Sequence, residues 1–323
     1  GSMTFTTPGH PGISEGPPNQ VLLALMLAVG TVAVPGRACA QLFDETPRIA
    51  VMSAFEPEWV ALQEALSDGQ EHRVGKVRFL SGTMEGRAVV LFLSGVSMVN
   101  AAMTTQMAID HFAVEGIVFS GIAGGVDPAL SIGDVVVPER WGQYLEGVLA
   151  RETQDGAFEV PGFLQAAPFP NFGMIFTREV GLPNAEGEPE KRFWFDVDPD
   201  MLETARRVAS SAELERCTGD GQCLEDPRIL VGGNGVSGSF FMDNAAFREH
   251  VFAAFEANVL DMESAAVAQV AAVNSVPFIA FRSLSDLAGG DGGAPNEMAT
   301  FMGLASGNAA SVVRAFLREH PAD

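Results

Sequence analysis

Residues 88–121 read AVVLFLSGVSMVNAAMTTQMAIDHFAVEGIVFSG and contain one complete strand–helix–strand unit. The run 88–95 is nearly all apolar, as expected of a strand that is buried on both faces. Residues 99–112 are predicted to form a helix, and 116–121 a second buried strand. A helix between two such strands indicates an α/β arrangement.

The same alternation continues on both sides of this unit. Strands are expected at 48–54, 76–82, 133–139, 228–233, 258–262 and 277–286, and helices at 56–66, 245–255, 264–273 and from the last strand to about 317. Apolar strands separated by helices predict a three-layer α/β/α sandwich around a central mixed β-sheet.

Residues of about 141–227 break this pattern and are interpreted as an inserted segment. They are rich in Pro and Phe and then acidic, and only 201–212 has helical periodicity. The chain from 41 to 323 is therefore expected to be one domain with an insertion, rather than two domains of equal size.

The N-terminal 40 residues are predicted to be a tag remnant followed by a signal peptide. Gly1-Ser2 is typical of an expression tag, and an uncharged apolar run at 21–34 precedes the small-x-small site that ends at Ala40. Cleavage after Ala40 would release a mature chain that is exported to the periplasm or secreted.

Two other interpretations of the apolar run are weaker. A buried helix would be ended abruptly by Pro35 and Gly36. A lipoprotein site at Cys39 would place Arg37 where such sites need a small residue.

The charge balance argues against binding to nucleic acid. The 323 residues contain 19 Lys and Arg against 41 Asp and Glu, a net charge of −22. Phosphate backbones are bound by clustered cations, and an acidic chain repels them and anionic membrane surfaces. We expect neither a nucleic-acid partner nor stable membrane insertion of the mature chain.

Cys217 and Cys223 lie in the sequence CTGDGQC and are predicted to form a disulfide, in agreement with export. A zinc site would need two further ligands, and the five histidines have no metal-binding spacing. No metal or other cofactor is expected.

Carboxylates gather where predicted strands end. Glu58 follows the first strand, and Asp286 ends the last strand. Asp261 and Glu263 flank Met262 at the end of a short strand. In open α/β sheets ligands bind at the carboxyl ends of strands, so these residues form a candidate site. Each has a structural alternative: Glu58 in a first helical turn, Asp261 and Glu263 as helix caps, and Asp286 as the start of the next turn.

A glycine pattern offers a weaker candidate. Gly233, Gly235 and Gly238 fit the GxGxxG dinucleotide motif loosely, but the accompanying acidic residue that binds ribose is missing at the expected distance. Dinucleotide binding is therefore disfavoured.

Six ordered segments carry a family resemblance: RIAVMSAFEPEW, SGVSMVNAAM, FSGIAGGVDPALSIGDVVVP, GVSGSFFM, VLDMESAAVAQVA and FRSLSDLAG. From about 48 to 318 the chain resembles the nucleoside phosphorylase/nucleosidase superfamily. Within it, the chain is most similar to the 5′-methylthioadenosine/S-adenosylhomocysteine nucleosidases. The resemblance implies a purine nucleosidase that hydrolyses the N-glycosidic bond of an adenine nucleoside and releases adenine.

The resemblance also implies roles for single residues. Asp286 matches the general acid that protonates N7 of the purine, Glu58 matches the carboxylate that activates water, and Arg282 helps to orient it. Glu263 matches the residue that binds the ribose hydroxyls. The remaining substrate-binding positions are Val96, Gly124, Phe241, Met242, Asp261, Met262 and Ser285, with Phe241 stacking on the base and Met262 beneath the sugar.

Two further comparisons with the family concern the reaction. Aspartate rather than asparagine at position 286 favours a 6-aminopurine. Superfamily phosphorylases place arginines after the first strand, where this chain has SAFEPEW, so hydrolysis is favoured over phosphorolysis. A phosphorylase and a secreted non-catalytic nucleoside-binding relative remain as alternatives.

Two positions depart from the family pattern. Ile122 stands where these nucleosidases usually have a hydroxyl residue, and Asp261 replaces a glutamate. The resemblance further implies a homodimer.

Overall fold

The computed structural model describes residues 42–290 and 292–321. The predicted leader, 1–40, lies outside them. Among the helices in the described part of the chain, none is long and apolar enough to cross a membrane.

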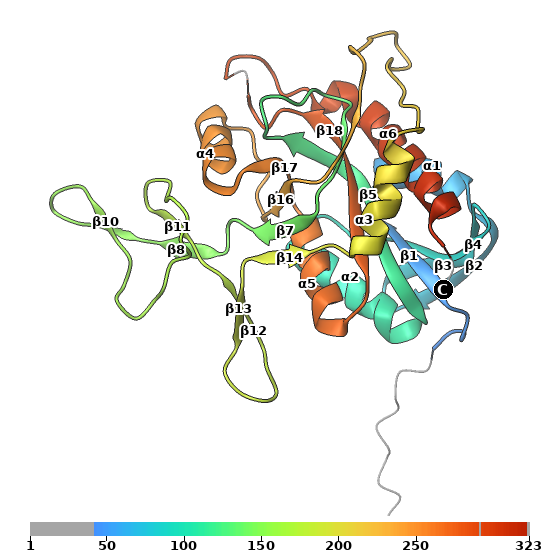
Figure 1. The fold of residues 1–323 in the computed structure, drawn as a ribbon, viewed down its shortest axis with the longest axis horizontal. Coiled ribbons are helices and arrows are strands. Elements are labelled where there is room, and N and C mark those ends of the chain that lie inside the picture. Colours follow the sequence, from blue (N-terminus) through green and yellow to red (C-terminus); the bar gives the residue numbers. More distant parts are fainter. Residues whose placement is uncertain (1–41, 291, 322–323) are drawn as a thin grey trace, which may run out of the picture. The chain divides into compact units, whose positions relative to one another are not determined.

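The long strand β5 (Val114–Gly125) organises the central sheet (Figure 1). Its first half pairs in parallel with β1 (Arg48–Ser53), and β18 (Phe278–Asp286) runs parallel to it from Ile117 to Gly124. Its last residues pair antiparallel with β17 (Ala257–Asp261). One strand thus aligns the ends of three others.

The sheet contains twelve strands in the described part of the chain and is mixed. Its main path runs β14-β7-β16-β17-β5-β1-β4-β3-β2, and β18, β6 and β15 branch from it. The strands not yet given are β2 (Ser67–Val74), β3 (Val77–Met84), β4 (Arg87–Leu93), β6 (Val135–Val137), β7 (Arg140–Gln143), β14 (Trp194–Asp196), β15 (Ile229–Val231) and β16 (Asn234–Ser237).

Helices cover both faces of this sheet, which confirms the predicted three-layer architecture (Figure 1). Helix α2 (Met98–His111) packs against α5 (Ser264–Asn274), while α1 (Glu56–Glu64) and α3 (Pro199–Ala209) pack against α6 (Met298–Glu319). Helix α4 (Ala245–Phe255) packs beside β17. All nine residues of β18 are buried, as expected of a strand between two helical layers.

Strand β2 is absent from the sequence prediction. Its sequence, SDGQEHRV, is polar and mostly exposed, yet it pairs antiparallel with β3 at the edge of the sheet. Hydrophobic periodicity detects buried strands, and an edge strand held by backbone pairing and facing water lacks that signal.

The segment predicted as an insertion contains more strand than its composition indicates. Strands β7 and β14 pair with each other and extend the main sheet. Between them lie three small pairs, made of β8 (Gly147–Leu149) with β11 (Ile175–Thr177), β9 (Arg151–Glu152) with β10 (Phe158–Glu159), and β12 (Val180–Leu182) with β13 (Glu190–Arg192).

Aromatic side chains join this segment to the core. Phe169 and Phe193 contact Phe255 at the end of α4, with ring centroids 4.8 and 5.5 Å apart. Further along, Cys217 and Cys223 form the predicted disulfide.

Candidate active site

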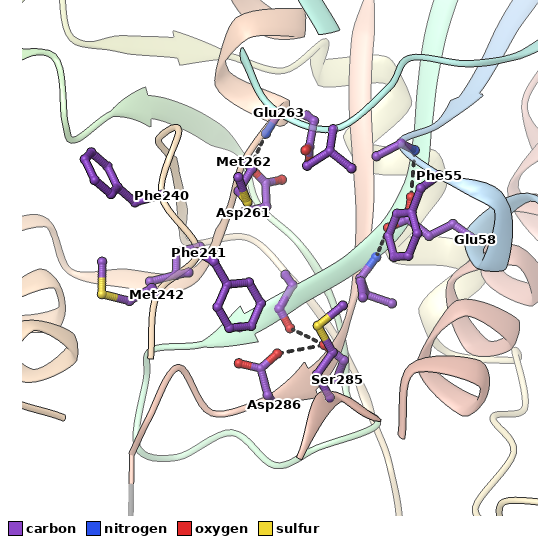
Figure 2. Close-up of a pocket in the computed structure, with 17 residues that line it drawn as sticks. Phe55, Glu58, Phe240, Phe241, Met242, Asp261, Met262, Glu263, Ser285 and Asp286 are labelled. Carbon is purple, nitrogen blue, oxygen red and sulfur yellow. Dashed lines mark hydrogen bonds between the residues drawn. The ribbon is translucent and has the colours of Figure 1, made fainter. Parts of the chain in front are cut away.

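A cavity of about 200 Å³ opens at the carboxyl ends of β1, β5, β17 and β18. Figure 2 shows Glu58, Glu263 and Asp286 approaching it from three directions, with Phe241 between them. Most of the remaining lining is apolar: Ala54, Phe55, Val96, Ile122, Ala123, Gly124, Phe240, Met242, Leu260, Met262 and Met298. Charged groups therefore face a site that contains few other polar atoms.

Glu58 is held by backbone donors at the start of α1. Its Oε2 accepts from Ala54 N at 2.6 Å, and its Oε1 accepts from Ile122 N at 2.8 Å. The side chain is 1% exposed, and this burial raises the pKa of Glu58, while the charge of Arg282 and the backbone donors act in the opposite direction. The carboxylate is thus fixed in one orientation.

Arg282 lies behind the cavity and is fully buried. Its guanidinium faces three carboxylates, at 2.8 Å from Asp261, 3.6 Å from Glu263 and 3.8 Å from Glu58. Its Cζ atom lies over the ring of Phe119, 4.0 Å from the ring centroid. One cation therefore compensates the three buried carboxylates only in part.

Asp261 holds the start of α5 and also lines the cavity, whereas Glu263 occupies the N-cap position but makes no side-chain capping hydrogen bond. Asp261 Oδ1 accepts from the Ser237 hydroxyl and from the N–H groups of Glu263 and Ser264, both at 3.1 Å. Asp261 therefore binds the start of the helix, as the structural alternative predicted, and still faces the cavity.

Glu263 lies under the start of α2. Its Oε1 accepts from Ser97 N at 2.7 Å. Burial raises its pKa to about 7, against the opposing charge of Arg282. Ser97 has φ 82° and ψ 165°, a conformation that is costly for a residue with a side chain. This strained conformation points the backbone N–H of Ser97 at the Glu263 carboxylate.

Asp286 ends β18 on the opposite part of the cavity. Its Oδ1 accepts from the Ser285 hydroxyl at 2.8 Å, and its Oδ2 accepts from Ala288 N at 3.0 Å. Burial raises the pKa of Asp286, and these hydrogen bonds oppose the rise. A carboxyl group with a raised pKa is suited to donate a proton.

The loop after β16 supplies an aromatic wall. Figure 2 shows Phe241 directed toward the cavity beside Asp286. Phe241 is 57% exposed, so its ring is accessible to a planar ligand.

A family model described as the phosphorylase superfamily matches residues 48–318. This chain belongs to that superfamily. The match includes every cavity residue of the described structure and agrees with the fold expected from the sequence.

Individual superfamily members are similar along most of their length. The 5′-methylthioadenosine/S-adenosylhomocysteine nucleosidase of Mycobacterium tuberculosis is 29% identical over 268 residues, covering 82% of this chain and 94% of the relative. The nucleosidase of the same name from Anoxybacillus flavithermus is 28% identical over 242 residues, covering 75% and 86%.

Solved structures of superfamily members agree with the fold. The Neisseria meningitidis nucleosidase, solved with methylthio-immucillin-A, has a TM-score of 0.63 and 25% identity, covering 84% of this chain and 98% of that one. Helicobacter pylori futalosine hydrolase has the same TM-score at 20% identity, covering 84% and 97%, and shares the fold.

The structure brings together nearly all residues that the superfamily resemblance assigned. Arg282 lies behind the wall, and the other ten line the cavity: Glu58, Val96, Gly124, Phe241, Met242, Asp261, Met262, Glu263, Ser285 and Asp286. Phe55 and Met298 also line it and were missed, because an apolar residue beside a strand end or at a helix start is indistinguishable from core in sequence.

The rejected glycine motif has a packing role instead. Gly235 lies on β16, where a side chain would overlap the ring of Trp141, and no helix starts directly after it. Gly235 therefore serves packing within the sheet.

Two absences in the described part of the chain bear on ligands. None of the described cavity residues is Lys, Arg or His. No group of three or more His, Cys, Asp and Glu among the described residues is arranged to hold a metal ion.

Proposed function

We propose that this protein hydrolyses the N-glycosidic bond of adenine nucleosides, with 5′-methylthioadenosine and S-adenosylhomocysteine as substrates, to release adenine. One observation carries the proposal: Glu58 and Asp286, both buried, face one largely apolar cavity from different strand ends. The names of the similar nucleosidases support the choice of substrates.

Asp286 acts on the base. Cleavage of an N-glycosidic bond passes through an oxocarbenium-like state, and a protonated base leaves more readily than an anionic one. The raised pKa of Asp286 keeps a proton available, and Phe241 stacks on the purine so that N7 faces this carboxyl.

Glu58 acts on the water. Its two backbone hydrogen bonds leave the carboxylate fixed at the cavity wall, where it accepts a proton from water as water attacks the sugar carbon. Arg282 favours the ionised form of Glu58. Ile122 contributes its N–H to Glu58, and its apolar side chain adds no hydroxyl at the water.

Glu263 and Met262 hold the sugar between these two groups. A carboxylate accepts hydrogen bonds from ribose hydroxyls, and negative charge near the ring stabilises a developing oxocarbenium ion. Met262 provides an apolar surface beneath the ring.

Hydrolysis is favoured over phosphorolysis by the charge of the cavity. A phosphate co-substrate needs cations, whereas the described lining contains carboxylates and the nearby Arg282 is already occupied by three of them. Phosphate would also be repelled by Glu58.

The test is a chromatographic panel of methylthioadenosine, S-adenosylhomocysteine and adenosine, with and without phosphate. We expect adenine release that is independent of phosphate. Asp286→Asn is expected to lower kcat by about 10²- to 10⁴-fold. Strict phosphate dependence would establish a phosphorylase, and binding without base release a non-catalytic receptor.

Export of the mature chain is a second proposal. It rests on the leader pattern in 1–40 and on the disulfide between Cys217 and Cys223. Cell fractionation with N-terminal mass spectrometry tests it: a mature chain starting at Gln41 outside the cytoplasm is expected, and an uncleaved cytoplasmic chain would refute it.

A homodimer is a third proposal. Val99 and Met103 on α2 and Val273 on the neighbouring α5 are exposed apolar residues, at 79%, 44% and 59%. A second copy would cover them. Light scattering of the wild type and of Val99→Asp tests this: a dimer that the variant weakens is expected, and a monomeric wild type would refute it.

A further inference from the structure

Asn296 lies between the end of β18 and α6 and connects three parts of the site. Its Nδ2 donates to Asp243 Oδ1 at 3.0 Å and to Asp286 Oδ2 at 3.4 Å. Its Oδ1 accepts from Met298 N at 3.0 Å, at the start of α6. Sequence reasoning missed this residue, and the superfamily resemblance assigned it no role.

These partners fix the orientation of the amide. Turned by 180°, it would direct its carbonyl oxygen at two carboxylates and its NH₂ group at a backbone donor. The NH₂ group must therefore face Asp243 and Asp286, which makes asparagine chemically specific at this position.

The two oxygens of Asp286 consequently differ. Oδ2 accepts from two N–H groups, those of Ala288 and Asn296. Oδ1 contacts only a hydroxyl in the described structure, that of Ser285, which also lies 3.5 Å from the carbonyl of Ala123. A hydroxyl is free to turn to that carbonyl, whereas an N–H group always donates.

We infer that Asn296 is a positioning residue of the general acid, which holds Asp286 Oδ2 as an acceptor and thereby places the transferable proton on Oδ1. This inference rests on the proposed function. The same amide donates to both Asp286 and Asp243. Because Asp243 directly follows Phe241 and Met242, this link fixes the position of Asp286 relative to the stacking residue Phe241.

The charges around Asp286 come from neighbouring elements. Glu297 at the start of α6 raises the pKa of Asp286, and the Asn296 hydrogen bond lowers it. Asp243 accepts a hydrogen bond from the same Asn296 NH₂ group. On α4, Arg248 donates to the Gly125 carbonyl at 2.9 Å. Strand β5 contributes the uncharged Ala123 and Gly124 beside the carboxyl.

The experiment compares pH profiles of kcat/KM for methylthioadenosine hydrolysis. The active form needs protonated Asp286, so activity falls above its pKa. Asn296→Asp replaces a donor by a negative charge and is expected to move this alkaline limb up by about one pH unit. Asn296→Ala is expected to move it in the same direction and to lower kcat by about tenfold. Glu297→Gln is expected to move it down.

Asn184→Asp is the matched control, because it makes the same chemical change in an exposed turn between β12 and β13. Its profile is expected to superimpose on that of the wild type. Unchanged limbs in both Asn296 variants would overturn the inference, since loss of structure alone would lower activity without moving them.

A second measurement separates failure of the inference from failure of the proposed function. The ¹³C carboxyl resonance of Asp286, assigned by its loss in Asp286→Asn, reports the pKa without turnover. If the wild type releases no adenine, the proposed function fails, and the titration still decides the inference. A titration of Asp286 that is the same in wild type, Asn296→Asp and Asn296→Ala would refute it.

Discussion

Arg282 Nε lies 2.8 Å from Asp261 Oδ2, and both side chains are buried. The same guanidinium faces Glu58 and Glu263, so removal of this one cation leaves three buried acids uncompensated. Removing one partner of a buried charge cluster lowers the stability of the fold by more than the intact cluster contributes to it.

Arg282→Met is therefore expected to lower the free energy of unfolding by about 3 to 5 kcal/mol at pH 8. The loss is expected to be smaller at pH 5, because Glu263, whose pKa burial raises to about 7, takes up a proton there. Urea unfolding at both pH values measures it. Arg314→Met, which removes a partly exposed pair with Glu85, is the control and should cost at most about 1 kcal/mol. Equal losses at both pH values would contradict this account.

Gly121 makes room for the Glu58–Arg282 pair. A Cβ atom at this position would overlap the guanidinium and the Glu58 carboxylate. Gly121→Ala is expected to destabilise the fold by about 1 to 3 kcal/mol and to lower kcat by about 10²-fold, because the water-activating carboxylate is displaced.

Gly303→Ala is the matched control for Gly121→Ala. Gly303 lies at an exposed position of α6 with open space around it, so the change should stabilise the fold by about 0.5 to 1 kcal/mol with unchanged turnover. Calorimetry and adenine release measure both variants. Full activity in Gly121→Ala would show that a side chain at this position does not displace the Glu58 carboxylate.

Relief of the backbone strain at Ser97 is expected to stabilise the fold, whereas Gly121→Ala destabilises it. Ser97→Gly keeps the N–H that binds Glu263 and removes the side chain that disfavours φ 82°. Stability is expected to rise by about 1 kcal/mol with activity retained. Ser210→Gly, at φ −79°, gains no such relief and should be destabilising. Thermal unfolding distinguishes the two, and a loss in Ser97→Gly would show that its hydroxyl matters more than its backbone.

The sequence predicted those parts of the site that follow from strand ends. Asp261 and Asp286 end apolar strands, and a sheet brings such ends together whatever the loops do. Ser97 and Asn296 escaped prediction for a different reason. A positive φ and an amide that reaches back ten residues depend on loop geometry, which hydrophobic periodicity does not encode.

The edge strand β2 was missed for a related reason. Its polar residues satisfy backbone pairing with β3 and water at once, so its sequence is compatible with a loop. Burial, which creates the pattern that identifies β18, is absent there.

The raised pKa of Glu263 couples stability to pH. Its pKa is 4.5 in an ordinary environment and about 7 in the folded chain. Between these values the folded state keeps a proton that the unfolded chain releases. The stabilising contribution of this proton is complete below about pH 4.5 and is lost as the pH rises through about 7.

Glu263→Gln mimics the protonated form at every pH. Its stability should match that of the wild type near pH 4.5 and exceed it by about 1 to 3 kcal/mol at pH 8, while loss of the ribose-binding carboxylate lowers kcat/KM. Urea unfolding across this pH range measures the difference. Glu186→Gln, on the exposed turn between β12 and β13, should follow the wild-type curve throughout. If the curves for Glu263→Gln and wild type ran parallel, Glu263 would titrate alike in both states, and burial would not govern its charge.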